Sequence, residues 1–287
     1  MLTICKREFR SYLTSMAGYV FIAFVLLVIG VYYTGYHMTM GYPIFGYTMS
    51  SSNFVFLIAT PVLTMRALAE EQRQKTDQLL LTAPVSVTDI VVGKYLGMLG
   101  IFTILVLILC FYPAILSVYG TVSLPAAYTS ILGFFLLGMA DLAVGLFLSS
   151  LTENSVIAAV STVGVLFLCF LMGGITSLLS ETAATSYLIL SLLVILFVIV
   201  AYFFIKNKVL ALVIGVMGEG VLSALYFLSS DKLEGVIQKV LYVFDMSGHF
   251  DDFAEGILNL SNVVYFLSIT VVFLFLTIQM IQKRRWS

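Results

Sequence analysis

The chain has 287 residues, of which 61% are hydrophobic and only 10% are charged, and its mean hydropathy is +1.10. Soluble domains contain roughly 45–50% apolar and about 25% charged residues, and a globule of this size has too little interior to bury the excess. The composition therefore predicts an integral membrane protein and excludes a soluble enzyme. The formal net charge of −1 excludes a basic surface for nucleic acid.

The N-terminal stretch, residues 1–16, mixes basic and apolar side chains before the first long apolar run. Ile4, Phe9, Tyr12 and Leu13 alternate with charged residues at helical spacing. This pattern predicts an amphipathic helix that lies along the inner membrane surface. A frayed, charged tail is the alternative.

Eight apolar runs then follow, each long enough to cross a hydrocarbon core that needs about 20 residues of helix. They are apolar on every face and about twice the length of membrane-spanning strands, which favours an all-α polytopic fold. Pro61 interrupts the second run, so we expect that helix to be packed inside a bundle where neighbours satisfy the freed carbonyl. The runs are Ala17–Thr34, Met49–Met65, Tyr95–Ser117, Ala126–Ser149, Ser155–Leu179, Tyr187–Ile205, Val209–Leu228 and Val263–Ile281.

The basic residues give the expected orientation, because cytoplasmic loops of membrane proteins are enriched in lysine and arginine. Eight spans with both termini inside place all the basic residues but Lys232 and Lys239 on the cytoplasmic side, which is 12 of the 14. We therefore predict a single membrane domain over residues 1–287, with about eight transmembrane helices and both termini cytoplasmic.

The longest cytoplasmic segment, residues 66–89, combines a charged helical pattern with an apolar run. Its first ten residues carry opposite charges three to four positions apart, which supports a helix. Leu79–Leu81 are apolar in an aqueous loop, so either a partner with a hydrophobic groove covers them or they fold back onto the bilayer surface. Ser86 and Asp89 resemble a capping box that opens the next helix.

Two carboxylates stand inside apolar runs, where ionisable residues are costly and therefore candidates for function. Asp141 is near the middle of the fourth run and Glu219 is near the middle of the seventh. They line a possible translocation path, or else they are protonated groups hydrogen-bonded to a neighbouring helix.

Residues 229–262 form the only sizeable predicted outer loop. Apolar residues at helical spacing predict an amphipathic helix on the outer leaflet, followed by a short helix around His249–Leu258. Carboxylates beside His249 could bind a metal, although a solvated acidic loop is the simpler interpretation.

Known catalytic motifs are missing from the sequence. Gly93 and Lys94 lack the upstream glycine and the following serine or threonine of a Walker A loop. The three cysteines, Cys5, Cys110 and Cys169, show no disulfide or CxxC metal spacing. We expect no catalytic residue, no metal and no cofactor in this chain.

Several stretches together resemble a known transporter family. Pro61–Arg66, Glu70–Glu71, Leu79–Ser86 and Ile90–Lys94 are similar to type-2 ABC transporter permeases. At the C-terminal end the sequence resembles the gliding-motility-associated branch of that family, in the stretches His249–Phe253 with Gly256, Val264–Ser268 and Arg284–Trp286. The chain departs from the family in having Lys75-Thr76-Asp77-Gln78 where a Gly-Thr-Leu-Glu element is usual, and in having eight predicted spans where many members have six.

The resemblance implies a function and a set of partners. In the family, the loop between the second and third spans contains a coupling helix that docks on a cytoplasmic ABC ATPase subunit, which binds MgATP. The resemblance also implies a second permease subunit, of the same or a related chain. It further implies that the transporter is an exporter in the bacterial inner membrane. The residues that this assigns to ATPase coupling are Glu70, Glu71, Arg73, Lys75, Thr76, Asp77, Leu79, Leu80 and Leu81.

Two other functions stay open from the residues alone. One is a polytopic membrane enzyme that uses Asp141 or Glu219 as a general acid or base. The other is a membrane scaffold without transport activity. Co-purification with an ATPase distinguishes the transporter from both.

Overall fold

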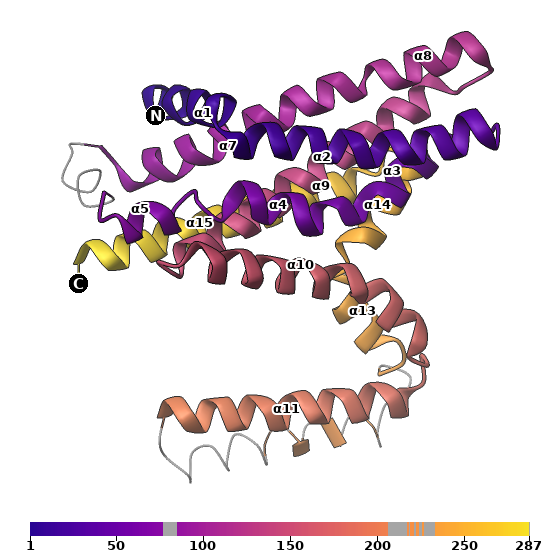
Figure 1. The fold of residues 1–287 in the computed structure, drawn as a ribbon. Coiled ribbons are helices and arrows are strands. Elements are labelled where there is room, and N and C mark those ends of the chain that lie inside the picture. The colour runs from indigo at the N-terminus through magenta and orange to yellow at the C-terminus, as the bar shows by residue number, and fades with distance from the viewer. Residues whose placement is uncertain are drawn as a thin grey trace. The chain divides into compact units, whose positions relative to one another are not determined.

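The computed structural model describes residues 1–76, 85–205, 217, 219–220, 222–223, 226 and 233–286. Their secondary structure is helical, without strands in these ranges. The chain forms two compact units (Figure 1), which are described separately: unit 1 is Met1–Phe170 with Ser247–Ser287, and unit 2 is Leu171–Met246.

Six stretches of the described residues are long and apolar enough to cross a membrane: Met16–Thr39, Gly46–Arg73, Val87–Tyr119, Leu124–Ser150, Ser155–Leu178 and Leu260–Arg284. Five of them contain a predicted run, and the fifth stretch matches the run Ser155–Leu179 to within its last residue. The sixth predicted run lies within α11 (Ala183–Ile205). The seventh, Val209–Leu228, lies mostly outside the described residues. The chain is thus a multi-pass membrane protein whose described secondary structure is helical, and the count of eight spans stays a prediction.

The first two helices are divided by a serine. α1 (Leu2–Thr14) ends at Ser15, whose extended backbone breaks the helix. The Ser15 hydroxyl then accepts a hydrogen bond from the Gly18 amide at 3.3 Å and so caps α2 (Met16–Tyr33). A short π-helix, η1 (Thr34–Thr39), continues α2 to the end of the first span.

The second span is segmented and buried. It consists of α3 (Gly46–Ser52), η2 (Asn53–Val55) and α4 (Phe56–Thr64), with Pro61 inside α4. Pro61 is buried against the rest of unit 1, as expected for a proline whose helix needs neighbours. The Thr64 hydroxyl donates to the Thr60 carbonyl at 2.9 Å, so this buried polar group is satisfied within its own helix.

The third span starts at the predicted cap. Ser86 accepts a hydrogen bond from the Asp89 amide at 3.0 Å and opens α7 (Val87–Leu109), which α8 (Phe111–Tyr119) continues. The helix therefore begins eight residues before the apolar run at Tyr95. Lys94 is the last of these eight residues, so it lies on α7 directly before the apolar run.

The fourth span is the most buried of the six candidate spans. α9 (Leu124–Ser150) packs against α4, α7 and α15 (Leu260–Trp286). Phe253 of α14 (Met246–Ala254) packs against α9 at Gly133, where a side chain would collide with the phenylalanine ring. The core of unit 1 is therefore built around α9.

The remaining helices include those of unit 2. α10 (Ser155–Leu178) begins in unit 1 and ends in unit 2, which also contains α11 and α13 (Val236–Tyr242). Gln238 of α13 donates to the carbonyls of Leu179 and Ser180 at 3.3 and 2.9 Å. These bonds hold α13 beside the connection between α10 and α11.

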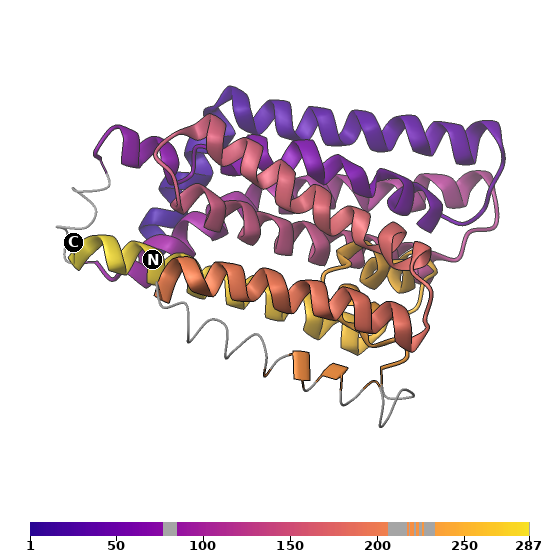
Figure 2. The same cartoon turned by 90° about the horizontal axis from the view of Figure 1, so that it is seen from below.

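Unit 1 has two distinct ends. Its N-terminus, the last turns of α15 and the helix α5 (Ala69–Arg73) lie at one end, and α3 and α14 lie at the other, in both views (Figures 1 and 2). Residues 66–76 are therefore at the same end of unit 1 as both chain termini.

Candidate functional site

The described part of the predicted coupling segment is residues 66–76, which contains α5. Its first amides are capped by a side chain from another helix: Ser149 of α9 accepts hydrogen bonds from the amides of Leu68 and Ala69 at 3.2 and 3.1 Å. The Gln72 side chain donates to the Ser150 carbonyl at 3.3 Å. Because the first N–H groups of a helix lack partners within it, Ser149 fixes the start of α5 to the end of α9.

Lys94 joins the same segment to α7. Its side chain is only 2% exposed, and its Nζ donates to Glu71 Oε1 at 2.7 Å, to the Ala67 carbonyl at 2.9 Å and to Glu8 Oε1 at 3.5 Å. An ammonium group has three donors, so these three acceptors satisfy it in a buried place. One side chain thereby links α7, residues 66–76 and α1.

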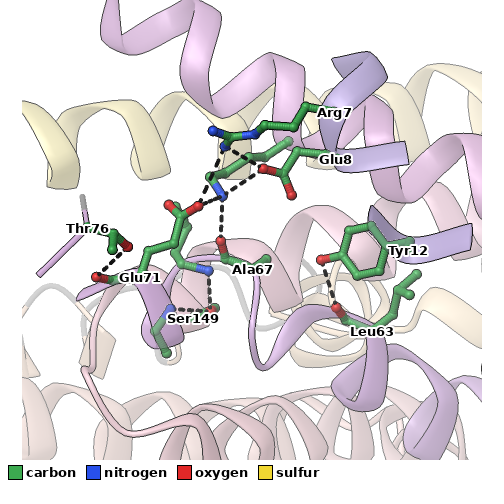
Figure 3. Close-up of polar contacts among 11 residues, drawn as sticks. Arg7, Glu8, Tyr12, Leu63, Ala67, Glu71, Thr76 and Ser149 are labelled. Atoms are coloured by element: carbon green, nitrogen blue, oxygen red, sulfur yellow. Dashed lines mark hydrogen bonds and ion pairs between the residues drawn. The ribbon is translucent and has the colours of Figure 1, made fainter. Parts of the chain in front are cut away.

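Arg7 completes the charge balance of this cluster. Its Nη2 lies 2.8 Å from Glu8 Oε1 and 3.8 Å from Glu71 Oε1, and Figure 3 shows these three side chains pointing toward one another. Two cations and two carboxylates thus share one site. We call Arg7, Glu8, Glu71 and Lys94 the charge cluster.

Tyr12 forms a second contact between α1 and the end of the second span. Its hydroxyl donates to the Leu63 carbonyl at 3.2 Å (Figure 3). Burial, reinforced by the negative charges of Glu8 and Glu71, raises the pKa of Tyr12 above its ordinary value. The phenol therefore remains a neutral donor to Leu63.

Small residues on α7 allow α1 to approach closely. Gly93, Gly97 and Gly100 face α1, and a Cβ atom at Gly97 would lie 2.6 Å from the Glu8 Cβ and 3.2 Å from the Phe9 amide nitrogen. Three glycines on one face let two helices approach to backbone contact. This close approach brings Glu8 within reach of Lys94.

The exposed side of residues 66–76 carries different groups. Arg73, Lys75 and Thr76 are exposed, whereas Glu71 is turned toward Lys94. Lys75 has a φ of 55°, a left-handed conformation that ends α5. Glu70 accepts hydrogen bonds from Gln74 at 2.8 Å and from Ser155 at 3.0 Å. The other predicted coupling residues, Asp77, Leu79, Leu80 and Leu81, lie outside the described residues.

The two carboxylates predicted inside apolar runs belong to different units. Asp141 is 5% exposed on α9 in unit 1. Glu219 belongs to unit 2, and its Oε1 atom is buried with no hydrogen-bond partner among the described residues. Asp141 is thus buried, Glu219 is partly exposed with one buried carboxylate oxygen, and a shared role in a translocation path stays a prediction.

The acidic stretch around His249 is less solvated than we expected. The His249 ring stacks on Tyr265 with 3.7 Å between ring centroids, and Phe250 and Phe253 are fully buried. Asp252 accepts hydrogen bonds from Asn259 and Asn262 at 2.9 and 2.8 Å. These contacts hold α14 against the other helices of unit 1. The buried face of α14 carries more aromatic than charged side chains.

Sequence reasoning missed Lys94 and Ser149 as parts of this site. The sequence places Lys94 on the cytoplasmic side and in a stretch that resembles the family, and Ser149 at the end of an apolar run, but it indicates no partner for either. A lysine within a glycine-spaced stretch at the edge of a span is a weak signal for such a pairing. Its partners are 23 and 86 positions away, so only the tertiary structure identifies them.

A comparison with known protein families identifies the family to which the chain belongs. A family model described as "ABC-2 family transporter protein" matches residues 4–214, well over half of the chain. No curated protein matches the sequence. The match includes α1, the segment around α5 and α7, so it covers the whole charge cluster. The chain therefore belongs to the ABC-2 family of transporter proteins, as a multi-pass membrane permease and a non-catalytic subunit of an ABC transporter.

Proposed function

We propose that the chain is the permease subunit of an ATP-driven exporter and that a separate cytoplasmic ATPase docks on residues 66–89. The observation that carries the proposal is the construction of residues 66–76. They expose Arg73, Lys75 and Thr76 to a partner, while Ser149 and Lys94 join them to two membrane helices. MgATP would bind in the ATPase, and this chain would supply no catalytic group.

Two sets of contacts can transmit a force on α5 to other helices of unit 1. One runs through Ser149 into α9, and the other runs through Glu71 and Lys94 into α7. Networks of hydrogen bonds and packed side chains can couple distant sites when the elements move as units. We therefore propose that ATP-driven movement of the docked ATPase tilts α7 and α9 together, and that α1 follows through Glu8.

The arrangement of the ends supports a cytoplasmic location for both termini. The N-terminus, the end of α15 and α5 lie at one end of unit 1, which requires an even number of crossings. Eight spans in the bacterial inner membrane also fit the distribution of basic residues. We further propose a second permease subunit, the same or a related chain, and membership of the gliding-motility-associated branch on the C-terminal resemblance.

The topology is tested by labelling single cysteines. Gln74 and Glu255 are both exposed. Gln74 directly follows α5 and Glu255 directly follows α14, and these helices lie at opposite ends of unit 1 (Figure 1). In the cysteine-free chain, Gln74→Cys should react with a membrane-impermeant maleimide only after the cells are opened, whereas Glu255→Cys should react in intact cells. Reaction of both in intact cells would contradict the proposed orientation.

ATPase docking is tested by Leu80→Asp. We expect Leu79–Leu81 to form the apolar anchor of the docking surface, and a buried apolar anchor carries more affinity than charges at the rim. The change should cost about 2 kcal/mol or more of binding and should release the ATPase during co-purification. Both Leu80→Asp and the wild-type chain should insert normally.

A matched control is Leu258→Asp, because Leu258 is 58% exposed at the opposite end of unit 1. That variant should keep its ATPase. If the Leu80→Asp variant kept all of its ATPase and transported normally, residues 66–89 would not be the docking element. Failure of the wild-type chain to co-purify with any ATPase would instead favour a scaffold.

A further inference from the structure

A cavity of about 560 Å³ lies beside the charge cluster, between α1, the start of α2, α4, residues 66–76 and α7. Its lining combines apolar and charged residues that come from different segments. Ala17, Val62 and Leu63 come from predicted membrane runs, whereas Arg66 and Glu70 come from the charged segment that follows. A cavity that is apolar on its membrane side and charged on the other matches an amphiphilic molecule.

Two of the charged side chains that line the cavity, Arg66 and Glu70, form no ion pair within 4.0 Å among the described residues. The six charged side chains of the lining include the charge cluster, whose two cations and two carboxylates pair with one another. Arg66 is exposed, and no carboxylate of the described residues lies within 4.0 Å of it. Glu70 accepts hydrogen bonds from the neutral side chains of Gln74 and Ser155, and the charges of Arg73 and Arg66 also act on its carboxylate without an ion pair within 4.0 Å.

We propose that this cavity binds a phospholipid with a phosphoethanolamine headgroup. The phosphate would lie toward Arg66, since a guanidinium forms paired hydrogen bonds to phosphate oxygens. The ammonium would lie toward Glu70, and the acyl chains would leave past Ala17 and Val62 into the bilayer. The hydroxyls of Ser11 and Ser15 also line the cavity and can donate to the phosphate.

The same charges disfavour the other common headgroups. A phosphatidylglycerol headgroup is anionic, so it would pair with Arg66 and leave Glu70 without a cation. A phosphocholine headgroup has the right net charge, but its methylated nitrogen has no N–H to donate to Glu70. The cavity therefore selects a zwitterion that has a primary ammonium group. The proposal does not depend on the direction of transport, and lipid binding is measured on the chain without the ATPase.

The test measures lipid binding to the purified full-length chain by native mass spectrometry. Phosphatidylethanolamine, phosphatidylcholine and phosphatidylglycerol with identical acyl chains are compared at equal concentrations. We expect phosphatidylethanolamine to be retained at a concentration about tenfold lower than the other two. Arg66→Gln should abolish this preference. Glu70→Gln should transfer it to phosphatidylglycerol, because only the cation then remains.

Arg10→Gln is the matched control, because Arg10 is an exposed arginine of α1 that does not line the cavity. It should bind the three lipids as the wild-type chain does. Soluble phosphoethanolamine should compete only at much higher concentration, since it has no acyl chains. Equal binding of the three lipids, unchanged preference in Arg66→Gln, or equally strong competition by soluble phosphoethanolamine would overturn the proposal.

Discussion

Replacing Lys94 by methionine should destabilise unit 1 more than any other single change at the charge cluster. The substitution keeps the length and packing of the side chain but removes the cation that Glu71 and Glu8 face at 2.7 and 3.5 Å. Removing one partner of a fully buried ion pair costs about 3–5 kcal/mol, and partial exposure of these carboxylates reduces this to about 2–3 kcal/mol. The midpoint of thermal unfolding in detergent should fall accordingly.

A double substitution separates the charge effect from the packing effect. Lys94→Met together with Glu71→Gln should recover most of the lost stability, because the unpaired carboxylate is then neutral and Arg7 still pairs with Glu8. Lys6→Met, at an exposed lysine of α1, should leave the unfolding midpoint unchanged. If Lys94→Met were as stable as Lys6→Met, the cluster would contribute nothing to the fold.

Gly97→Leu should displace α1 from α7. A Cβ atom at this position would already lie 2.6 Å from Glu8 Cβ and 3.2 Å from the Phe9 amide nitrogen, and backbone cannot move aside as a flexible side chain can. Overpacking costs about 1–3 kcal/mol, and the lost contact between Glu8 and Lys94 adds to it. We expect a lower unfolding midpoint and a complex that hydrolyses ATP but transports poorly.

The control for this change is Gly164→Leu in α10, where a Cβ atom would meet nothing within 4 Å. Leucine there should be neutral or slightly stabilising, because leucine favours helix over glycine by roughly 0.5–1 kcal/mol. Gly97→Ala should give an intermediate result. A Gly97→Leu chain with wild-type stability and transport would show that α1 need not lie against α7.

Local features of this protein could be predicted from the sequence. Ser86 and Asp89 form the expected helix start because a cap depends on residues three positions apart. The spans could be recognised because apolar length is read directly along the chain, and the burial of Pro61 follows from the need to satisfy its helix. The family could be recognised from the stretches around the coupling segment.

Contacts between distant parts of the chain could not be predicted in the same way. The pairing of Lys94 with Glu71 depends on how the loop between them folds back, and charge patterns along the sequence do not encode that path. The acidic residues around His249 suggested a solvated loop, but Phe250 and Phe253 bury the helix that carries them. Three glycines on α7 are visible in the sequence, whereas the helix that they accommodate is not.

The contact between α1 and α7 has a consequence for the order of events during synthesis. Glu8 and Lys94 are 86 positions apart, so at about 5–20 residues per second α1 is complete roughly 4–17 s before its binding surface on α7 exists. Throughout that interval, two further spans enter the membrane, and α1 can contact only these spans, as Tyr12 does at Leu63, but not α7. An amphipathic helix can wait at the bilayer surface with its apolar side in the headgroup region. The amphipathic pattern of α1 thus allows it to bind the bilayer surface for a time. After the third span inserts, α1 would pack against α7 in the bundle.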